Sequence, residues 1–230
     1  MNGHDGEFDL LTEHLRAWLG DWPPRRPVQL VGSTARERPG WDGVVRPVIG
    51  VGDATSLVLS VPPAAERRLR RADVGDRGHP TPLLAEQLGI GADGSRPIQW
   101  DRAVLRWTAR PTDLPEVGRW VPSGHPALPA WLHPFDGDVL VALDDAGTVS
   151  AAAARKRHTR HGHEIAVGTE PAARGRGLAR ALVAQMARSI LAEDAVPLYL
   201  HARDNVASAR VADAAGLPDR GWEYLELRGA

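Results

Sequence analysis

A glycine- and arginine-rich loop, Arg174-Gly-Arg-Gly-Leu-Ala-Arg180, has the residue types and spacing to hold a phosphate group. It follows an apolar segment that ends at Thr169, and it comes directly before an amphipathic stretch that begins at Gly177. Glycine lets the backbone approach a ligand closely, and a helix N-terminus offers free amides and a positive dipole end to an anion. The stretch therefore predicts binding of a phosphate-containing ligand.

Two common nucleotide-binding loops do not fit this stretch. A Walker A loop needs a lysine after its second glycine, and Lys156 is the only lysine of the chain. A dinucleotide-binding fingerprint needs a small residue where this chain has Arg180, because helix and sheet must approach closely there.

A third type of loop fits better. Arg174-x-x-Gly177-x-Ala179 matches the pattern Arg/Gln-x-x-Gly-x-Gly/Ala, and the region resembles the GNAT acetyltransferase superfamily in its C-terminal half. The resemblance extends by strand and helix order over roughly residues 138–227, and Leu105–Pro115 is similar to the family's first strand and turn. The family's next motif, Asn-x-x-Ala-x-x-Leu-Tyr-x-x-x-Gly-Phe, is matched or approximated by Asn205, Ser208, Val211, Gly216 and Leu217.

The resemblance implies that the chain binds acetyl-CoA. By analogy, the loop amides would hold the pyrophosphate, and the guanidinium groups of Arg174 and Arg176 would add charge-assisted hydrogen bonds. The pantetheine arm would pair with the backbone of Val167–Thr169, where two strands splay apart. Asn205 would hold the next helix against that arm, or act as a plain helix N-cap. The expected cofactor-binding residues are Val167, Gly168, Thr169, Arg174, Gly175, Arg176, Gly177, Leu178, Ala179, Arg180, Asn205 and Ser208.

Acetyl transfer from a thioester to an amine needs a proton acceptor, an oxyanion donor and a proton donor for the thiolate. The chain has no cysteine, so we expect direct attack in a ternary complex, as the resemblance also implies. Glu164 is the expected base, with partial burial raising its pKa; His163 and His201 are alternatives. The oxyanion donor is expected to be a backbone amide near Val167 or Gly168, where the family's strand bulges.

The proton donor is where the chain departs from the family. The family's usual tyrosine would fall at position 212, and this chain has Ala212. Ser208, Tyr199 and Tyr224 are the candidates to replace it. The expected catalytic residues are Glu164, His201 and Tyr224.

The stretch Arg155–His163 combines four basic residues with three histidines. No carboxylate or cysteine completes an obvious ligand set, so no metal site is expected. A solvated basic hairpin is the plainer interpretation, and charge near the acceptor cleft would favour an acidic substrate. Four tryptophans are expected in core and interface packing, with an acceptor pocket as the alternative: Trp100, Trp107, Trp120 and Trp131.

Composition indicates an ordinary globular protein, with 43% hydrophobic and 25% charged residues and a net charge of −1. That charge gives no support to nucleic-acid binding. The absence of cysteine excludes disulfides and thiolate metal sites. We expect no signal peptide and no membrane segment, and hence a cytoplasmic protein.

The pattern of apolar residues and turns predicts an α/β fold with a mixed sheet. Residues 7–19 are expected to form a helix, 48–61 strand–turn–strand, and 98–109 a strand, with helices at 64–72 and 81–88 and short helical pieces at 112–120 and 126–132. The expected C-terminal strands are 139–143, 148–158, 164–169, 197–202 and 222–227, with helices at 177–193 and from 205 to 215.

Two domains are expected, an N-terminal α/β region over 1–123 and a GNAT core over 124–230 that could begin near residue 100. After Gly216 only one strand is found where the family has two, which would leave a sheet edge exposed. We therefore expect residues 48–61 or 98–109 to pack on or extend the sheet, and the N-terminal region to be a degenerate half of the same fold.

The sequence thus predicts an acetyl-CoA-dependent N-acetyltransferase that acts on a primary amine, with a small molecule as the expected acceptor. The alternative is a non-catalytic acyl-CoA-binding module that uses the same cleft. The expected partners are acetyl-CoA and the amine, with neither nucleic acid nor membrane; homodimerisation is left open.

Overall fold

The computed structural model describes residues 5–69, 99–135 and 137–228. The chain divides into two compact units, one with residues 1–14 and 105–220 and the other with residues 15–104 and 221–230. Each unit consists of two separate segments of the sequence, so no single cut separates them. The boundary expected near residue 123 stays a prediction about which parts fold independently.

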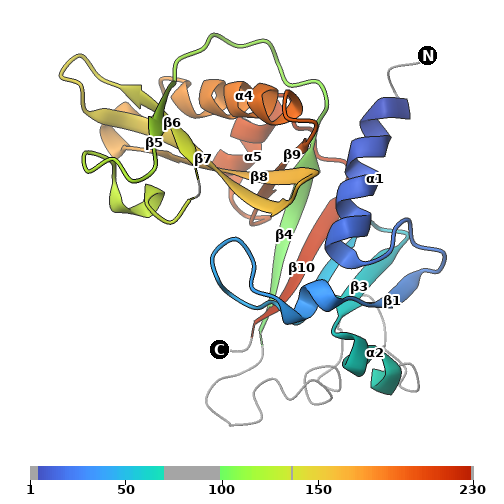
Figure 1. The fold of residues 1–230 in the computed structure, drawn as a ribbon. Coiled ribbons are helices and arrows are strands. Elements are labelled where there is room, and N and C mark those ends of the chain that lie inside the picture. The colour runs from blue at the N-terminus through green and yellow to red at the C-terminus, as the bar shows by residue number, and fades with distance from the viewer. Residues whose placement is uncertain (1–4, 70–98, 136, 229–230) are drawn as a thin grey trace. The chain divides into compact units, whose positions relative to one another are not determined.

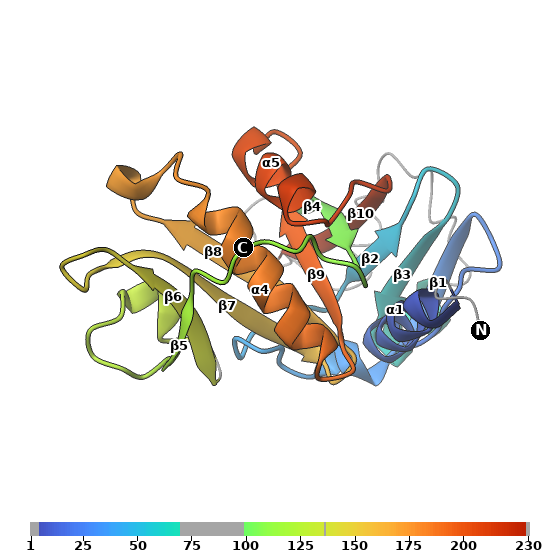
Figure 2. The ribbon, with the colours of Figure 1, turned by 90° about the horizontal axis from the view of Figure 1, so that it is seen from above.

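The first unit is a sheet with helices α4 and α5 packed together on one face (Figure 2). Its strand order is β9–β8–β7–β6–β5, with β8 and β9 parallel and the other neighbours antiparallel. Its elements in chain order are the first part of α1 (Asp5–Leu19), the end of β4 (Gln99–Trp107), β5 (Arg119–Pro122), η2 (Ala130–Leu132), β6 (Asp138–Leu143), β7 (Val149–Thr159), β8 (Gly162–Thr169), η3 (Pro171–Ala173), α4 (Leu178–Leu191), β9 (Val196–His201) and α5 (Val206–Ala214).

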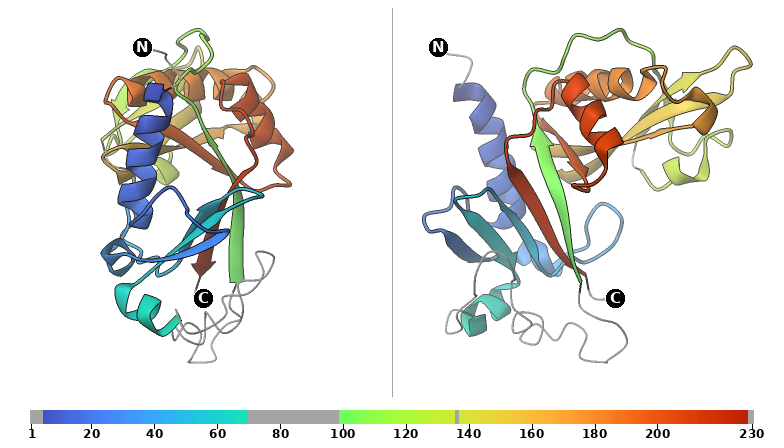
Figure 3. Two further views of the ribbon diagram at one scale, coloured as in Figure 1. Left: turned by 90° about the vertical axis from the view of Figure 1, so that its right-hand side faces the viewer. Right: turned by 180° about the vertical axis from the view of Figure 1, so that it is seen from behind.

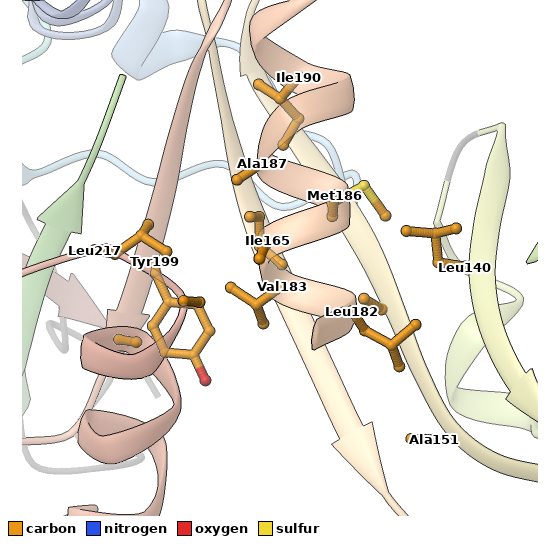
Figure 4. Packing of buried hydrophobic residues seen from close by; sticks show 14 of the residues in the cluster. Leu140, Ala151, Ile165, Leu182, Val183, Met186, Ala187, Ile190, Tyr199 and Leu217 are labelled. Carbon is orange, nitrogen blue, oxygen red and sulfur yellow. The ribbon is translucent and has the colours of Figure 1, made fainter. Parts of the chain in front are cut away.

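The core of this unit lies between the sheet and helix α4. The apolar face of α4, with Leu182, Val183, Met186 and Ile190, is fully buried against β6, β7, β8 and β9 (Figure 4). Small residues on β7 alternate between the two faces, and Ala151 and Ala153 lie under the helix. The 3.6-residue period of the apolar positions in this helix explains why its location was predicted correctly.

The strands of the second unit follow the order β1–β3–β2–β10, with β1 and β3 parallel and the other neighbours antiparallel (Figure 1). Helix α2 packs beside β1, and Ala65 and Leu69 of this helix join a core with strand residues such as Leu59 and Leu225 (Figure 3). The remaining elements of this unit are the end of α1, β1 (Val28–Gly32), η1 (Thr34–Glu37), β2 (Ile49–Gly52), β3 (Leu57–Val61), α2 (Pro63–Leu69), the start of β4 and β10 (Trp222–Arg228).

The edge of the last strand, β10, pairs with a strand from the N-terminal part of the chain, as the sequence predicted. β10 pairs antiparallel with β2, with Tyr224 opposite Val51, so residues from the 48–61 segment extend the sheet at β10. Both units contain mixed sheets with flanking helices, which confirms the expected α/β class.

Several expected elements were wrong or missing. No helix forms at 112–120, where the chain is irregular before β5, and the piece expected at 126–132 is only the short η2. Strand β1 was not predicted at all. The helix expected at 81–88 lies outside the described residues, and the one expected at 64–72 is described only to Leu69.

Candidate functional site

Two residues of the glycine-rich loop between β8 and α4 adopt a backbone conformation that glycine favours. Gly175 and Gly177 both have φ of 78°, the left-handed region that residues with a Cβ rarely adopt. Gly177 is the N-cap of α4, and it has no side chain to cap the helix. The first intrahelical bond comes from the Ala181 amide to the Gly177 carbonyl, so the amides of Leu178–Arg180 precede the helical ladder and face the loop.

The arginines of this loop are exposed. Arg174, Arg176 and Arg180 carry positive charge around the helix N-terminus, and Gly177 has the Arg180 guanidinium packed close to it. Uncapped amides, a helix dipole and guanidinium groups together fit an anionic ligand.

Strands β8 and β9 separate next to this loop. Their parallel register runs from Gly162 opposite Val196 to Glu164 opposite Leu198 and ends there, although β8 continues to Thr169 and β9 to His201. Along its other edge, β8 stays paired with β7 up to Thr169. One edge of residues 165–169 therefore has no β9 partner, and its backbone groups are left to pair with an extended ligand.

Strand β8 shows no bulge beyond Glu164. Its register with β7 is unbroken from Thr169 opposite Ala151 to His163 opposite Arg157. The bulge expected near Val167 or Gly168 is therefore absent, and the register shifts instead at the far end of the hairpin, between Arg157 and Thr159.

Glu164 is the last residue of β8 that pairs with β9, and its carboxylate contacts a lysine and a histidine. Its side chain is 7% exposed, with one carboxylate oxygen 2.5 Å from Lys156 Nζ and the other 2.9 Å from His158 Nε2. Burial alone would raise the pKa of Glu164, but the hydrogen bond and charge of His158 and the charge of Lys156 outweigh burial, so the pKa is lowered. The expected rise in pKa is therefore wrong, and Glu164 is an ionised carboxylate in an ion-pair cluster.

His201 is held in a network around a buried arginine. Its Nε2 accepts a hydrogen bond from Arg106 Nε at 2.8 Å, and its Nδ1 lies 2.8 Å from the carbonyl oxygen of Ala202. Because Nδ1 must donate to that carbonyl, the imidazole is neutral and its lone pair on Nε2 is engaged by Arg106. This arrangement argues against His201 as a base.

His163 lies on the α4 face of the hairpin, on the side opposite to Glu164. Burial, together with the charges of Arg157 and Arg155, lowers the pKa of His163 to about 4. The same two arginines pair with Glu193, at 3.2 Å and 2.5 Å respectively. Three of the four basic residues of the hairpin thus pair with two carboxylates, Glu164 and Glu193, while Arg157 and Arg160 stay exposed.

Tyr199 is the candidate proton donor that lies on β9 at the strand opening. It directly follows Leu198, the last paired residue of β9, and its side chain is buried in the core beside Leu217 (Figure 4). Burial raises the pKa of the Tyr199 phenol, and a hydrogen bond from the Ser208 side chain partly opposes that rise.

Ser208 lies one helical turn before Ala212 on α5, and Asn205 caps this helix by accepting the Ser208 amide at 3.0 Å. A side chain on a helix covers the turn N-terminal to its own Cα. A tyrosine at position 212 would therefore cover Ser208, the place where the Tyr199 hydroxyl lies.

Tyr224 belongs to the second unit. Its hydroxyl donates to Glu226 at 2.8 Å, and its ring stacks on Trp18 with centroids 5.5 Å apart. The structure therefore gives Tyr224 a packing role in that unit.

A cavity of about 250 Å³ lies beside the loop, lined by Trp131, Pro129, Val149, Gly168 and Arg174 among others. Trp131 is 40% exposed and packs over Gly168, so of the four tryptophans it is the one that lines this cavity. Trp107 is buried in the core instead. In the part of the chain that the structure describes, no group of three or more His, Asp or Glu side chains could hold a metal ion, and no helix is long and apolar enough to cross a membrane.

Sequence reasoning missed two residues of this region. Arg106 looked like one polar position of an alternating strand, and its partners lie about a hundred residues away. His158 was noted only as a possible metal ligand, yet it contacts Glu164. The one signal for it was its spacing of two residues from Lys156 on a strand, which puts both side chains on the same face.

In this α/β protein, an uncapped helix N-terminus and an arginine-rich loop lie next to the point where two parallel strands stop pairing. The family model described as the acetyltransferase (GNAT) family matches residues 102–216, half of the chain. The protein therefore belongs to the GNAT acetyltransferase family. No curated protein matches the sequence significantly.

Similar solved structures include a GCN5-related N-acetyltransferase-like protein from Streptococcus suis 89/1591, with 16% identity, a TM-score of 0.49, and coverage of 96% of this chain and 99% of that one. A putative GNAT acetyltransferase from Novosphingobium aromaticivorans DSM 12444 has 19% identity and a TM-score of 0.47, over 56% of this chain. The match spans 64% of the length of that Novosphingobium structure.

Proposed function

We propose that the protein is an acetyl-CoA-dependent N-acetyltransferase that transfers an acetyl group to a primary amine of a small molecule. One observation carries the proposal. The pairing of β8 and β9 stops at Glu164 and Leu198, and the unpaired edge of β8 leads directly to the uncapped helix N-terminus at Gly177. An extended ligand with a phosphate at one end fits that path.

The residues present suit acetyl-CoA in this position. The amides of Leu178–Arg180 and the guanidinium groups of Arg174 and Arg176 would hold the pyrophosphate, and the unpaired backbone of Val167–Thr169 would hold the pantetheine arm. When bound, the donor supplies an acetyl group activated as a thioester.

The chain's own residues supply the rest of the chemistry. The charged cluster at Glu164 marks where the strands part, so it is positioned to receive the proton that the amine loses. Backbone amides on the open edge of β8 would donate to the carbonyl oxygen as negative charge develops on it. Tyr199 would donate the proton that the departing sulfur takes up.

A replacement in the loop tests the binding part of the proposal. Gly177→Ala should weaken acetyl-CoA binding about tenfold, because a left-handed alanine costs roughly 1–2 kcal/mol and its Cβ would lie 3.0 Å from Arg180 Nε. Calorimetric titration with acetyl-CoA measures the change. Gly147→Ala is the matched control, since Gly147 has φ of 80° in a turn remote in sequence from the loop. Equal losses of affinity in both variants would contradict the role of the loop.

The second candidate function is a non-catalytic acyl-CoA-binding module. Two observations favour it: Ala212 stands where the family has its tyrosine, and Glu164 is held ionised by Lys156 and His158. Both candidates predict stabilisation by acetyl-CoA, so thermal shift alone does not separate them.

Release of free CoA separates the two functions. The protein is incubated with acetyl-CoA and a panel of amines, namely spermidine, tryptamine, tyramine, kanamycin and a lysine-containing peptide, and the thiol is measured over time. An acetyltransferase should release CoA faster with at least one amine than without any, and the acetylated product should appear by mass spectrometry. Thermal stabilisation by acetyl-CoA with no amine-dependent release would identify the binding module instead.

A further inference from the structure

The cavity of about 250 Å³ beside the arginine-rich loop is not used by the proposed function. Ala152 and its partner Gly168 line it and point away from α4, because Ala151 and Ala153 of the same strand lie under that helix. The indole of Trp131 lies over Gly168 on this face of the sheet. The volume is below the roughly 300–1,000 Å³ of pockets for drug-sized ligands, so the cavity suits a smaller molecule.

Trp131 is anchored in the wall of this cavity. It belongs to η2, whose Leu132 is fully buried, and its ring meets that of Phe135 edge-on, with centroids 6.1 Å apart and planes at 89°. A Cβ on Gly168 would come within 2.9 Å of Trp131 Cζ2, so glycine at this position lets the indole lie against the strand. The Trp131 side chain nevertheless stays 40% exposed. An anchored and partly exposed aromatic ring can attract a cation over its face.

Glu170 brings a carboxylate to the same side of the sheet. Its amide donates to the Ser150 carbonyl at 2.9 Å, which continues the β7–β8 ladder one step past Thr169. The backbone of Glu170 is extended, with φ of −57° and ψ of 140°. Because side chains alternate along an extended chain, Glu170 lies on the face of Gly168 and Trp131, and it lines the cavity. Within the described residues, its carboxylate forms neither a hydrogen bond nor an ion pair.

Arg174 brings the opposite charge to the cavity. It is exposed and belongs to the cavity lining, and among the residues that the structure describes its guanidinium group has no acidic or hydrogen-bonding partner. The cavity lining thus has one unpaired charge of each sign, from Glu170 and Arg174. A purely cationic ligand would be repelled by the guanidinium, and a purely anionic ligand by the carboxylate. A molecule that has both an ammonium group and a carboxylate is attracted by both residues.

We infer that this cavity is a binding site for a small zwitterion of the amino-acid type, in addition to the site proposed for acetyl-CoA. The ammonium group of the zwitterion contacts Glu170 and the ring face of Trp131, and its carboxylate accepts charge-assisted hydrogen bonds from Arg174. The zwitterion is recognised there and is not acetylated there. Glu164, where β8 and β9 part, lies six residues before Glu170, roughly 20 Å away along an extended strand.

The first test uses the full chain without acetyl-CoA, because the proposed function also assigns Arg174 to the pyrophosphate of the donor. Calorimetric titration compares three zwitterions, namely 3-aminopropanoate, 4-aminobutanoate and 6-aminohexanoate, with butylamine and butanoate, which have one charge each. At least one zwitterion should bind about tenfold more tightly than both singly charged molecules. Binding of butylamine or butanoate as tight as that of every zwitterion, or binding of none of the five, would overturn the inference. Failure of the proposed function leaves this result unchanged, since neither donor nor acceptor is in the sample.

Three replacements test the contacts of the zwitterion that binds most tightly. Glu170→Gln and Arg174→Gln should each weaken its binding about tenfold. Trp131→Leu should weaken it about threefold, because leucine keeps an apolar wall but offers no aromatic face to the ammonium group. Arg176→Gln is the matched control, since Arg176 is an exposed arginine of the same loop and lies outside the cavity lining. An equal loss in Arg174→Gln and Arg176→Gln, or parent affinity in Glu170→Gln, would contradict the proposed contacts; circular dichroism confirms that each variant is folded.

The indole N–H signal of Trp131 shows independently where the zwitterion binds. This NMR signal is assigned as the one lost in Trp131→Leu, and titration of the parent with the zwitterion should shift it more than those of the other tryptophans. In Glu170→Gln the same shift should need about tenfold more ligand. A zwitterion that binds by calorimetry but leaves the Trp131 signal in place would lie elsewhere on the protein, and the inference would then be wrong.

Discussion

Methionine in place of Arg106 is expected to lower the free energy of unfolding by about 3 kcal/mol. The Arg106 side chain is only 4% exposed, and it donates to three acceptors that come from different parts of the first unit. These are His201 Nε2 at 2.8 Å, Asp213 Oδ1 at 2.5 Å and the Leu217 carbonyl at 3.2 Å. Methionine fills a similar volume but leaves the histidine nitrogen and the carbonyl without a donor.

Urea unfolding of the parent and the variant measures this loss. Arg210→Met is the matched control, because Arg210 is an exposed arginine of α5 and surface replacements usually change stability by less than about 0.5 kcal/mol. Asp213 is 60% exposed, so Asp213→Asn should cost less than Arg106→Met. An Arg106→Met variant as stable as the Arg210→Met control would show that the buried guanidinium does not hold β9 and α5 together.

Phenylalanine in place of Tyr199 is expected to lower turnover about 100-fold while acetyl-CoA affinity stays the same. The replacement removes the hydroxyl that Ser208 contacts and leaves the buried ring in the core. Because burial raises the pKa of Tyr199, the phenol keeps its proton through the neutral range and is ready to donate it. The lost hydrogen bond should cost only about 1 kcal/mol of stability.

Steady-state kinetics with the best amine, together with calorimetric titration of acetyl-CoA, measures both quantities for Tyr199→Phe. The chain has two tyrosines, so Tyr224→Phe provides the direct comparison. Loss of turnover in Tyr224→Phe but not in Tyr199→Phe would show that the proton donor is not on β9.

The parts of the fold that sequence predicted well are those whose local pattern and tertiary role agree. Helix α4 has an apolar stripe of helical period and a glycine before it, and both features survive in the structure. Strand β5 was missed because it is an exposed strand at the edge of its sheet, so Arg119–Pro122 shows no apolar alternation. Strand β1 begins directly after Pro27 and is short, so the sequence indicated a loop there.

In the candidate site, too, some features could be predicted from the sequence and others could not. The loop from Arg174 to Arg180 could be predicted because its glycines, its arginines and the helix after it are contiguous in the chain. The ionisation state of Glu164 could not be predicted, because burial and ion pairing shift a carboxyl pKa in opposite directions. Which effect is larger depends on the side chains of Lys156 and His158 across the hairpin, and only the structure shows that both of them reach the carboxylate.

The pairing of β10 with β2 has a consequence for how the protein is made. Tyr224 lies opposite Val51, which the ribosome joins to the chain 173 residues earlier. Throughout that interval, one edge of β2 and its apolar residues lack the strand that covers them in the finished protein. The second unit must therefore complete its sheet after residues 222–228 have been synthesised, and long-range pairing of this kind folds slowly. Nascent chains that have reached only the end of α5 should depend on chaperones to stay soluble.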